Sequence, residues 1–223
     1  MSFRATARRR SYLVLFLLGL IAAPAAFGQA ANSPVAFANE DAITTSFVAA
    51  PSVQSPDSTT PPSAEPGQWL KVEFHYGTTD ALKTKYLDSI QFKVWIEGRD
   101  LLDPRGKPGE GIAVALTGSV TYINVAADKD IYGVFYVHPS TLARYSTDQG
   151  YEDFDRKFDV HLEAYVGGAL MDAINKNKGE NDPLGWFKPL TPIANLVYRQ
   201  DQCPFMMCDT DRYPAIKLPA EAQ

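Results

Sequence analysis

Within residues 68–76, QWLKVEFHY, apolar and polar side chains alternate without a break from Leu70 to Tyr76. Leu70, Val72, Phe74 and Tyr76 fall in one phase of this alternation, and polar residues together with one tryptophan fill the other phase. Successive side chains of a strand point to opposite faces of a sheet, so this period of two predicts a strand with one buried face. The stretch therefore places the chain among proteins that build their core from sheets.

Similar patterns follow along the chain between Gly- and Pro-rich turns. They predict strands at residues 90–96, 112–117, 119–126, 131–138, 158–166 and 193–199. Two short helices are predicted, at residues 139–145 and 168–178. About seven strands without a βαβ rhythm indicate a mainly β protein, an antiparallel immunoglobulin-like β-sandwich with one or two short helices. We assign residues 67–223 to this domain.

The N-terminus predicts export from the cytoplasm. Four arginines within residues 1–10 precede an apolar run over residues 12–27, and small residues follow at Gly28 and Ala30. This order is typical of a secretory signal peptide, which we assign to residues 1–28. The apolar run is shorter than the roughly 20 residues of a membrane span, so we expect no stable membrane span after cleavage.

Residues 29–66 have the composition of a linker, rich in Ala, Ser, Thr and Pro, and residues 31–66 carry no Lys or Arg. Such a composition favours a disordered tether. Within it, residues 43–48, ITTSFV, have β-propensity and offer an alternative, a strand that pairs with a sheet edge of this or a neighbouring molecule. Both interpretations stay open at this point.

The charge of the exported chain disfavours nucleic acid as a partner. Removing residues 1–28, which hold four arginines and no acids, changes the formal net charge from −5 to −9. An acidic chain repels phosphate backbones and anionic membrane surfaces.

The only two cysteines are Cys203 and Cys208. In an oxidising compartment an even pair favours a disulfide. A zinc site would need further Cys or His ligands, which the C-terminal region does not contain. We therefore predict a disulfide that pins a local turn.

No motif in the sequence indicates catalysis. His75 and His161 fall in the polar phase of their strands, where solvated histidines are expected, and no Gly-x-Ser-x-Gly elbow is present. The carboxylates within residues 152–155 have the composition of an acidic surface loop, with general acid–base work as the less favoured alternative. We predict no catalytic residues and no cofactor.

Metal binding has equally weak sequence support. Asp128 and Asp130 have the spacing of the first two ligands of a calcium-binding loop, but Pro139 occupies the position where the bidentate Glu of such a loop is expected. Asp209 and Asp211 form another acidic turn. We predict no metal site, and a structural calcium in either turn is left open.

Three aromatic residues fall in the polar phase of predicted strands, namely Trp69, Trp95 and Tyr165. Such residues suit an interaction surface, either for a protein or for stacking on sugar rings. Alternatively, a loop, the linker or the predicted helix at 168–178 covers them, since most large aromatic side chains are substantially buried.

From QWLKVEF at 68–74 to CPFMMC at 203–208, the order of strands resembles a family of pilus-like secreted proteins. These are encoded in pilus-associated gene clusters of gut mucin-dwelling Gram-negative bacteria, and the resemblance covers residues 68–218. It implies an immunoglobulin-like sandwich at the cell envelope with a non-enzymatic role, and it supplies no catalytic residues. The chain differs from true pilins because it lacks their retained N-terminal helix.

The sequence therefore favours an accessory or adhesive component of a cell-surface assembly, located in the periplasm, on the outer surface or outside the cell. Its expected partners are further copies of itself or other envelope or pilus-associated proteins, with a host glycan or protein as another possibility. Two alternatives stay open: a carbohydrate-binding module that uses Trp69, Trp95 and Tyr165, and a secreted hydrolase with an unrecognised site.

Overall fold

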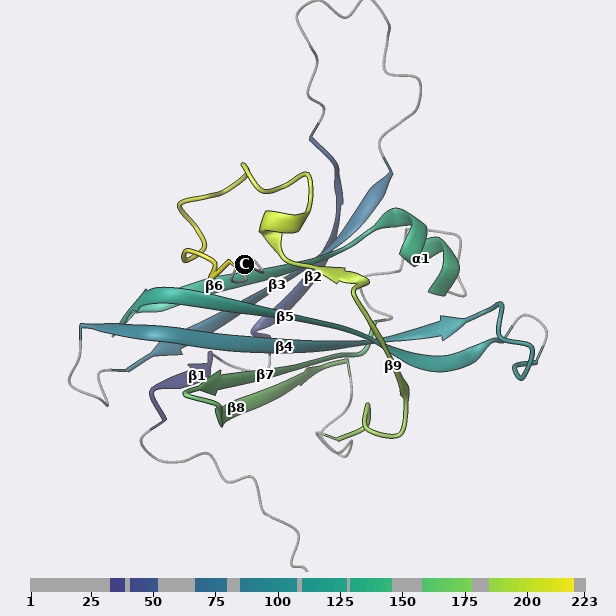
Figure 1. Cartoon of the computed structure of the whole chain (residues 1–223), viewed down its shortest axis with the longest axis horizontal. Coiled ribbons are helices and arrows are strands. Elements are labelled where there is room, and N and C mark those ends of the chain that lie inside the picture. Colours follow the sequence, from purple (N-terminus) through teal and green to yellow (C-terminus); the bar gives the residue numbers. More distant parts are fainter. Residues whose placement is uncertain are drawn as a thin grey trace, which may run out of the picture.

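The computed structural model describes residues 33–38, 41–51, 67–79, 85–107, 110–127, 129–145, 158–177 and 185–218. These residues form two sheets that lie one against the other, with a helix at one end (Figure 1). The elements are β1 (Val35–Phe37), β2 (Ile43–Ala49), β3 (Gln68–Thr78), β4 (Tyr86–Asp100), β5 (Ile112–Ala126), β6 (Asp130–Val137), α1 (Pro139–Tyr145), β7 (Val160–Val166), β8 (Ala169–Lys176), β9 (Thr191–Ala194), β10 (Val197–Tyr198) and the 3-10 helix η2 (Gln200–Gln202).

The mainly β fold and its sandwich architecture are confirmed. The first sheet has the order β1-β3-β6-β10, with β2 also paired to β3, and the second has the order β8-β7-β4-β5-β9. The described residues contain ten strands rather than seven. Nearly all pairings are antiparallel, but β9 runs parallel to β5, so the second sheet is mixed.

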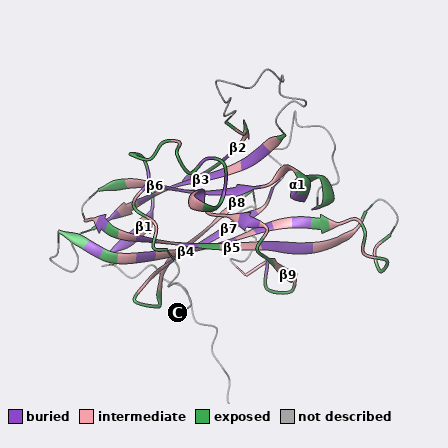
Figure 2. Ribbon diagram, turned by 45° about the horizontal axis from the view of Figure 1, so that its top comes forward, coloured by how far each residue is buried: buried purple, intermediate pink, exposed green. Residues whose placement is uncertain are grey.

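The core lies between the two sheets, where Figure 2 shows the buried residues concentrated along the strands. The apolar phase of residues 68–76 supplies its centre, since Leu70, Val72, Phe74 and Tyr76 are all 0% exposed. Opposite them, β4 contributes the alternating side chains Ile90, Phe92, Val94 and Ile96. The alternation that predicted these strands therefore also identifies the core face.

A glycine makes room for a cluster of aromatic rings in the core. Gly133 of β6 is paired with Phe74 of β3, and a Cβ at this position would lie 2.1 Å from Cζ of Phe74. The ring therefore occupies the space of the missing side chain. It also packs on Phe92 and Phe135, with ring centroids 4.7 and 5.8 Å away.

The predicted linker at 29–66 contains two strands of the first sheet, so the linker assignment is wrong for residues 35–37 and 43–49. Both strands pair with the same edge of β3, because β6 occupies the other edge. Phe37 faces Tyr76, and Ile43 faces Phe74. The chain advances six residues from Phe37 to Ile43, whereas β3 advances only two between their partners. The two strands are therefore one edge strand, interrupted by four extra residues.

The helix predicted at 168–178 is wrong, because this segment is β8 and pairs antiparallel with β7. The decisive feature is the Gly167-Gly168 pair, whose φ angles are +58° and +82°. Two adjacent residues with positive φ form the tight turn that connects twisted antiparallel strands. This signal outweighs the helical spacing of Leu170, Met171 and Ile174.

The single strand predicted at 193–199 is divided between the sheets, and this division is another correction. β9 joins the second sheet and β10 joins the first, with Asn195 between them in the left-handed region at φ 65°. Conversely, Gly118 does not separate two strands but lies inside β5. A Cβ there would lie 2.9 Å from Cβ of Val197, so this glycine lets the crossover approach the sheet.

The helix predicted at 139–145 is confirmed as α1.

Candidate interaction surfaces

Trp69 lies on the outer face of the first sheet but is covered. Its side chain is only 7% exposed and belongs to a second apolar cluster with Tyr136, Phe205 and Tyr213. Its ring centroid lies 4.6 Å from that of His138 and 5.7 Å from that of Phe205. The C-terminal segment therefore buries this tryptophan, and it offers no ring face to a ligand.

Trp95 and Tyr165 lie on the outer face of the second sheet, on the opposite side of the molecule's core from Trp69. Both are partly exposed. The ring of Trp95 stacks on Phe187, with centroids 4.4 Å apart and planes 30° apart. The three aromatic residues thus do not form one platform, because strands of two different sheets hold them.

Tyr165 is held by a charged neighbour on each side. Its hydroxyl donates a hydrogen bond to Oε2 of Glu163 at 2.5 Å, and Nζ of Lys93 lies 4.3 Å from its ring centroid. Burial, and then the hydrogen bond and charge of Glu163, raise the pKa of Tyr165 to about 12. This tyrosine therefore stays protonated as a hydrogen-bond donor.

His161 is fully buried, which corrects the expectation of a solvated histidine. Nδ1 lies 2.7 Å from Oδ1 of Asn175, which also accepts a hydrogen bond from Nε1 of Trp186, so Nδ1 is the donor. Nε2 lies 3.4 Å from Oε1 of Glu163, and Phe187 stacks over the ring at 4.5 Å. Among the described residues, neither nitrogen of His161 hydrogen-bonds a Ser, Thr or Cys side chain.

His138 does contact a hydroxyl, but in a capping arrangement. Nδ1 lies 2.7 Å from Oγ of Ser140 and accepts a hydrogen bond from the Ser140 backbone N–H at 3.0 Å. The carbonyl of His138 accepts from the backbone N–H groups of Thr141 and Leu142. These contacts satisfy backbone donors at the start of α1, as N-terminal capping requires.

The two cysteines are free thiols in the structure and lie in the C-terminal segment that covers Trp69. Sγ of Cys203 donates to the carbonyl of Gln200 at 3.3 Å, while Nε2 of Gln200 donates to the carbonyls of Phe205 and Cys208. Burial raises the pKa of the Cys203 thiol to about 11. The disulfide between these residues stays a prediction.

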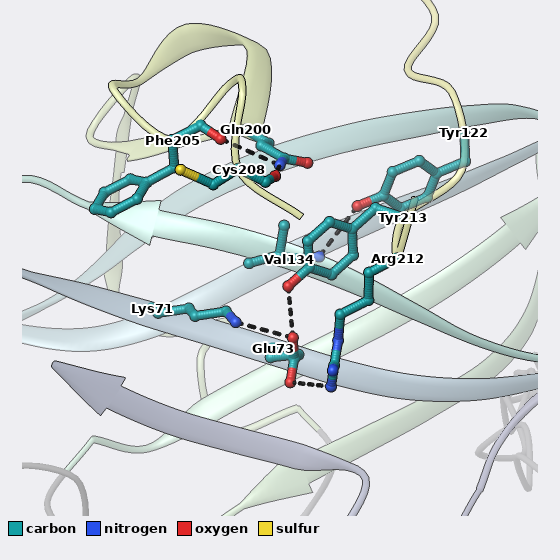
Figure 3. Close-up of polar contacts among 9 residues, drawn as sticks. All are labelled: Lys71, Glu73, Tyr122, Val134, Gln200, Phe205, Cys208, Arg212 and Tyr213. Atoms are coloured by element: carbon teal, nitrogen blue, oxygen red, sulfur yellow. Dashed lines mark hydrogen bonds and ion pairs between the residues drawn. The ribbon is translucent and has the colours of Figure 1, made fainter. Parts of the chain in front are cut away.

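A charged network fastens this C-terminal segment to the first sheet (Figure 3). Oε1 of Glu73 accepts from the hydroxyl of Tyr213 at 2.5 Å and lies 3.0 Å from Nζ of Lys71. Oε2 accepts from Arg212 at 2.9 Å. Burial alone would raise the pKa of Glu73, but these hydrogen bonds and positive charges outweigh it and lower that pKa.

A groove of about 530 Å³ opens on the second sheet beside the crossover from β9 to β10. Its sheet side carries Lys93 and Trp95 from β4 and Ser119 from β5, and its other side carries Asn195 and Arg199. This groove could not be predicted from the sequence, because the crossover brings residues 195–199 next to residues 93–95 of β4, which are far away along the chain. Only the outward phase of Lys93 and Trp95 was predictable.

Metal binding finds no support in the described part of the chain, where no three His, Cys, Asp or Glu side chains gather into a possible site. Asp209 and Asp211 are exposed, while Asp128 and the acidic residues 152–155 lie outside the described residues. The predicted signal peptide also lies outside them. Within them, no helix has the length and apolar character needed to cross a membrane.

Comparison with known proteins places the chain in a family. A protein-family model matches residues 31–220, beginning inside the predicted linker. Among four matching chains of solved structures is a crystal structure of a protein from Akkermansia muciniphila, with 19% identity, a TM-score of 0.65, and coverage of 83% of this chain and 93% of that chain. No curated protein matches the sequence. Because the family model spans most of the sequence, the chain belongs to the family that this model describes, and it shares the β-sandwich fold of the Akkermansia muciniphila protein.

Proposed function

We propose that the protein is an exported, non-enzymatic component of a cell-surface assembly, and that its copies associate through the edge strand formed by β1 and β2. The export-type N-terminus and the resemblance to pilus-like secreted proteins support the location. The structural similarity to a protein from Akkermansia muciniphila, a mucin-dwelling gut bacterium, is consistent with that role.

The observation that carries the proposal is the length of chain between two adjacent antiparallel strands. β2 ends at Ala49 and β3 begins at Gln68, so residues 50–67 connect them. Hairpin connections usually need two to five residues. A connection of this length lets the edge strand reach β3 of its own chain or β3 of a neighbouring copy, with the same backbone hydrogen bonds in either case.

The edge strand must also stay paired with a β3 strand, of its own chain or of another copy, because its apolar side chains are buried. Val35 is 0% exposed and Ile43 is 4% exposed, so both insert into the core. Its backbone is secured on the side away from β3 as well, where the N–H of Phe37 donates to Oδ2 of Asp172 at 2.8 Å. An empty edge would expose this apolar surface, which favours exchange between copies over release.

The three histidines support the non-enzymatic part of the proposal. Within the described residues, His75 stacks on the ring of Tyr132 at 4.7 Å, His138 caps α1, and His161 hydrogen-bonds the side-chain amide of Asn175. None of them forms the nucleophile–base–orienting group arrangement of covalent hydrolases. Turnover of ester, peptide or glycoside substrates by the purified chain would contradict this part.

Strand exchange can be tested by trapping the pairing as a disulfide. Ser46 and Lys71 face each other across β2 and β3 on the outer face, so Ser46→Cys with Lys71→Cys should cross-link on mild oxidation. The background variant carries Cys203→Ser and Cys208→Ser. Exchange predicts covalent dimers and larger species on a non-reducing gel of the mature chain, whereas exclusively monomeric cross-linked chains would overturn the proposed route of association.

A matched control pair is available in the second sheet. Gln91 and Thr121 face each other across β4 and β5, whose pairing does not involve the N-terminal segment. The pair Gln91→Cys with Thr121→Cys should therefore cross-link only within one chain. Covalent oligomers from this control would show that random collision, rather than strand exchange, links the copies.

A further inference from the structure

We propose that the groove beside the β9–β10 crossover binds a sugar unit that carries an acidic group. This inference goes beyond the proposed role in assembly, because the groove lies on the second sheet and the edge strand belongs to the first. Its volume of about 530 Å³ falls in the range of small-ligand sites.

The charge of the groove differs from that of the chain. Its lining contains two cationic side chains, Lys93 and Arg199, and no Asp or Glu, although the whole chain carries a formal net charge of −5. The acids that neighbour these cations, Asp201 beside Arg199 and Glu163 opposite Lys93, are not part of the lining. A concave surface of one sign concentrates its field on a ligand of the opposite sign. The lining therefore favours an anionic group.

Both cations are held in place from outside the groove. Nε and Nη2 of Arg199 donate to the two carboxylate oxygens of Asp201 at 3.0 and 2.9 Å, which leaves Nη1 without a partner among the described residues. Nζ of Lys93 rests over the ring of Tyr165 and has no ion pair within 4.0 Å in the described part of the chain. Each cation is thus fixed in position but keeps donors for a ligand.

The remaining lining suits a sugar ring better than a bare anion. Ser119 contributes a hydroxyl, Asn195 and Gln202 contribute amides, and Trp95 contributes an aromatic surface. Phe187 supports the indole from one side by stacking. Amides and hydroxyls match the alternating donors and acceptors of a sugar, and an aromatic ring packs against its C–H groups.

The test uses the indole N–H signals of the mature chain in a ¹H–¹⁵N spectrum, since the sequence has only three tryptophans. Methyl β-glucuronide and methyl β-glucoside differ only in the carboxylate. The glucuronide should shift the Trp95 signal in a saturable manner, while the glucoside binds at least about tenfold more weakly, the size of a charge-assisted hydrogen bond. The signal of Trp69, buried on the other sheet, should not move.

Variants separate the groove from general electrostatics. Lys93→Gln should weaken glucuronide binding about tenfold, whereas Lys107→Gln, an equal charge change at an exposed position outside the groove, should leave it unchanged. No saturable Trp95 shift with the glucuronide would overturn the proposal. Equal shifts with inorganic phosphate or with a triglutamate peptide would also overturn it, because the site would then recognise charge without a sugar. Either result leaves the edge-strand proposal unaffected.

Discussion

The hydroxyl of Tyr213 donates a hydrogen bond of 2.5 Å to Oε1 of Glu73, joining residues that are 140 positions apart. Arg212, the preceding residue, reaches the other carboxylate oxygen. Glu73 thus holds two consecutive side chains of the C-terminal segment on the outer face of β3. This anchoring point lies beside the cluster that buries Trp69, so its strength determines how firmly that aromatic surface is covered.

Removing the hydroxyl should weaken this anchor measurably. We expect Tyr213→Phe to lower the free energy of unfolding by about 1–2 kcal/mol, because the bond has a charged acceptor and a buried donor residue. Urea unfolding measures the change, and a double-mutant cycle with Glu73→Gln isolates the pairwise contribution. Tyr86→Phe, at a side chain that is 59% exposed, is the matched control and should change little. Equal effects of the two Tyr→Phe variants would contradict the assigned role of Tyr213.

The same carboxylate should make stability depend on acid pH. The pKa of Glu73 is lower in the folded protein than its ordinary value of 4.5. The unfolded chain therefore binds the proton first as the pH falls. The stabilising contribution is complete above the ordinary pKa and is lost as the pH falls through the lowered one. Urea unfolding at a series of pH values below about 6 should show a shallower acid decline for Glu73→Gln than for the unaltered chain.

A neighbouring carboxylate gives the control for this pH experiment. Asp211 lies in the same C-terminal segment, is exposed, and has no side-chain hydrogen bond or ion pair with another described residue. Asp211→Asn should leave the acid decline unchanged. If both variants flatten the curve equally, the net charge of the segment, rather than the contacts of Glu73, causes the pH dependence.

The inner faces of the sheets were predictable from local periodicity, but the coverage of the outer faces was not. Phe74 and Phe92 were assigned correctly because alternation alone decides which side of a strand they occupy. Trp69 and His161 share the polar phase, yet segments distant in sequence bury them: the C-terminal residues cover Trp69, and Phe187 covers His161. Periodicity predicts which side chains share a face of a strand, but it does not predict whether a distant segment covers that face.

The core glycine Gly133 should tolerate no side chain. A Cβ there would lie 2.1 Å from Cζ of Phe74, whose ring is held by other core rings. We expect Gly133→Ala to lower the free energy of unfolding by about 3 kcal/mol, or to prevent folding. Gly77→Ala is the control, since its Cβ would meet Oδ1 of Asp130 at an ordinary 3.6 Å, and its effect should stay below about 1 kcal/mol.

A second variant keeps this test informative if Gly133→Ala does not fold. Phe74→Leu removes the ring atoms that the new methyl group would meet, so Gly133→Ala with Phe74→Leu should recover soluble, cooperatively unfolding protein. Failure of the double variant alongside a folded Phe74→Leu single variant would show that another contact requires the glycine.

Phe187 should hold the turn at residues 185–190 onto the second sheet. It is 8% exposed and stacks on both Trp95 and His161. We expect Phe187→Ala to lower the free energy of unfolding by about 3 kcal/mol, as for other buried aromatic truncations, and to shift the Trp95 indole signal. Lys188→Ala, at the exposed neighbouring position, is the control. An unchanged Trp95 signal in Phe187→Ala would contradict the stacking arrangement.

The two thiols should differ in reactivity when the protein is reduced. Cys203 is buried, and burial raises its pKa to about 11, so little thiolate forms at neutral pH, whereas Cys208 is partly exposed. We expect iodoacetamide to modify Cys208 first, as measured by peptide mass spectrometry over time, with the two rates converging in urea.

Protein recovered from an oxidising compartment should resist alkylation at both positions until it is reduced, because the predicted disulfide then joins them. Rapid labelling of both cysteines in such unreduced protein would rule out the disulfide, and faster labelling of Cys203 in the folded, reduced protein would contradict its buried position.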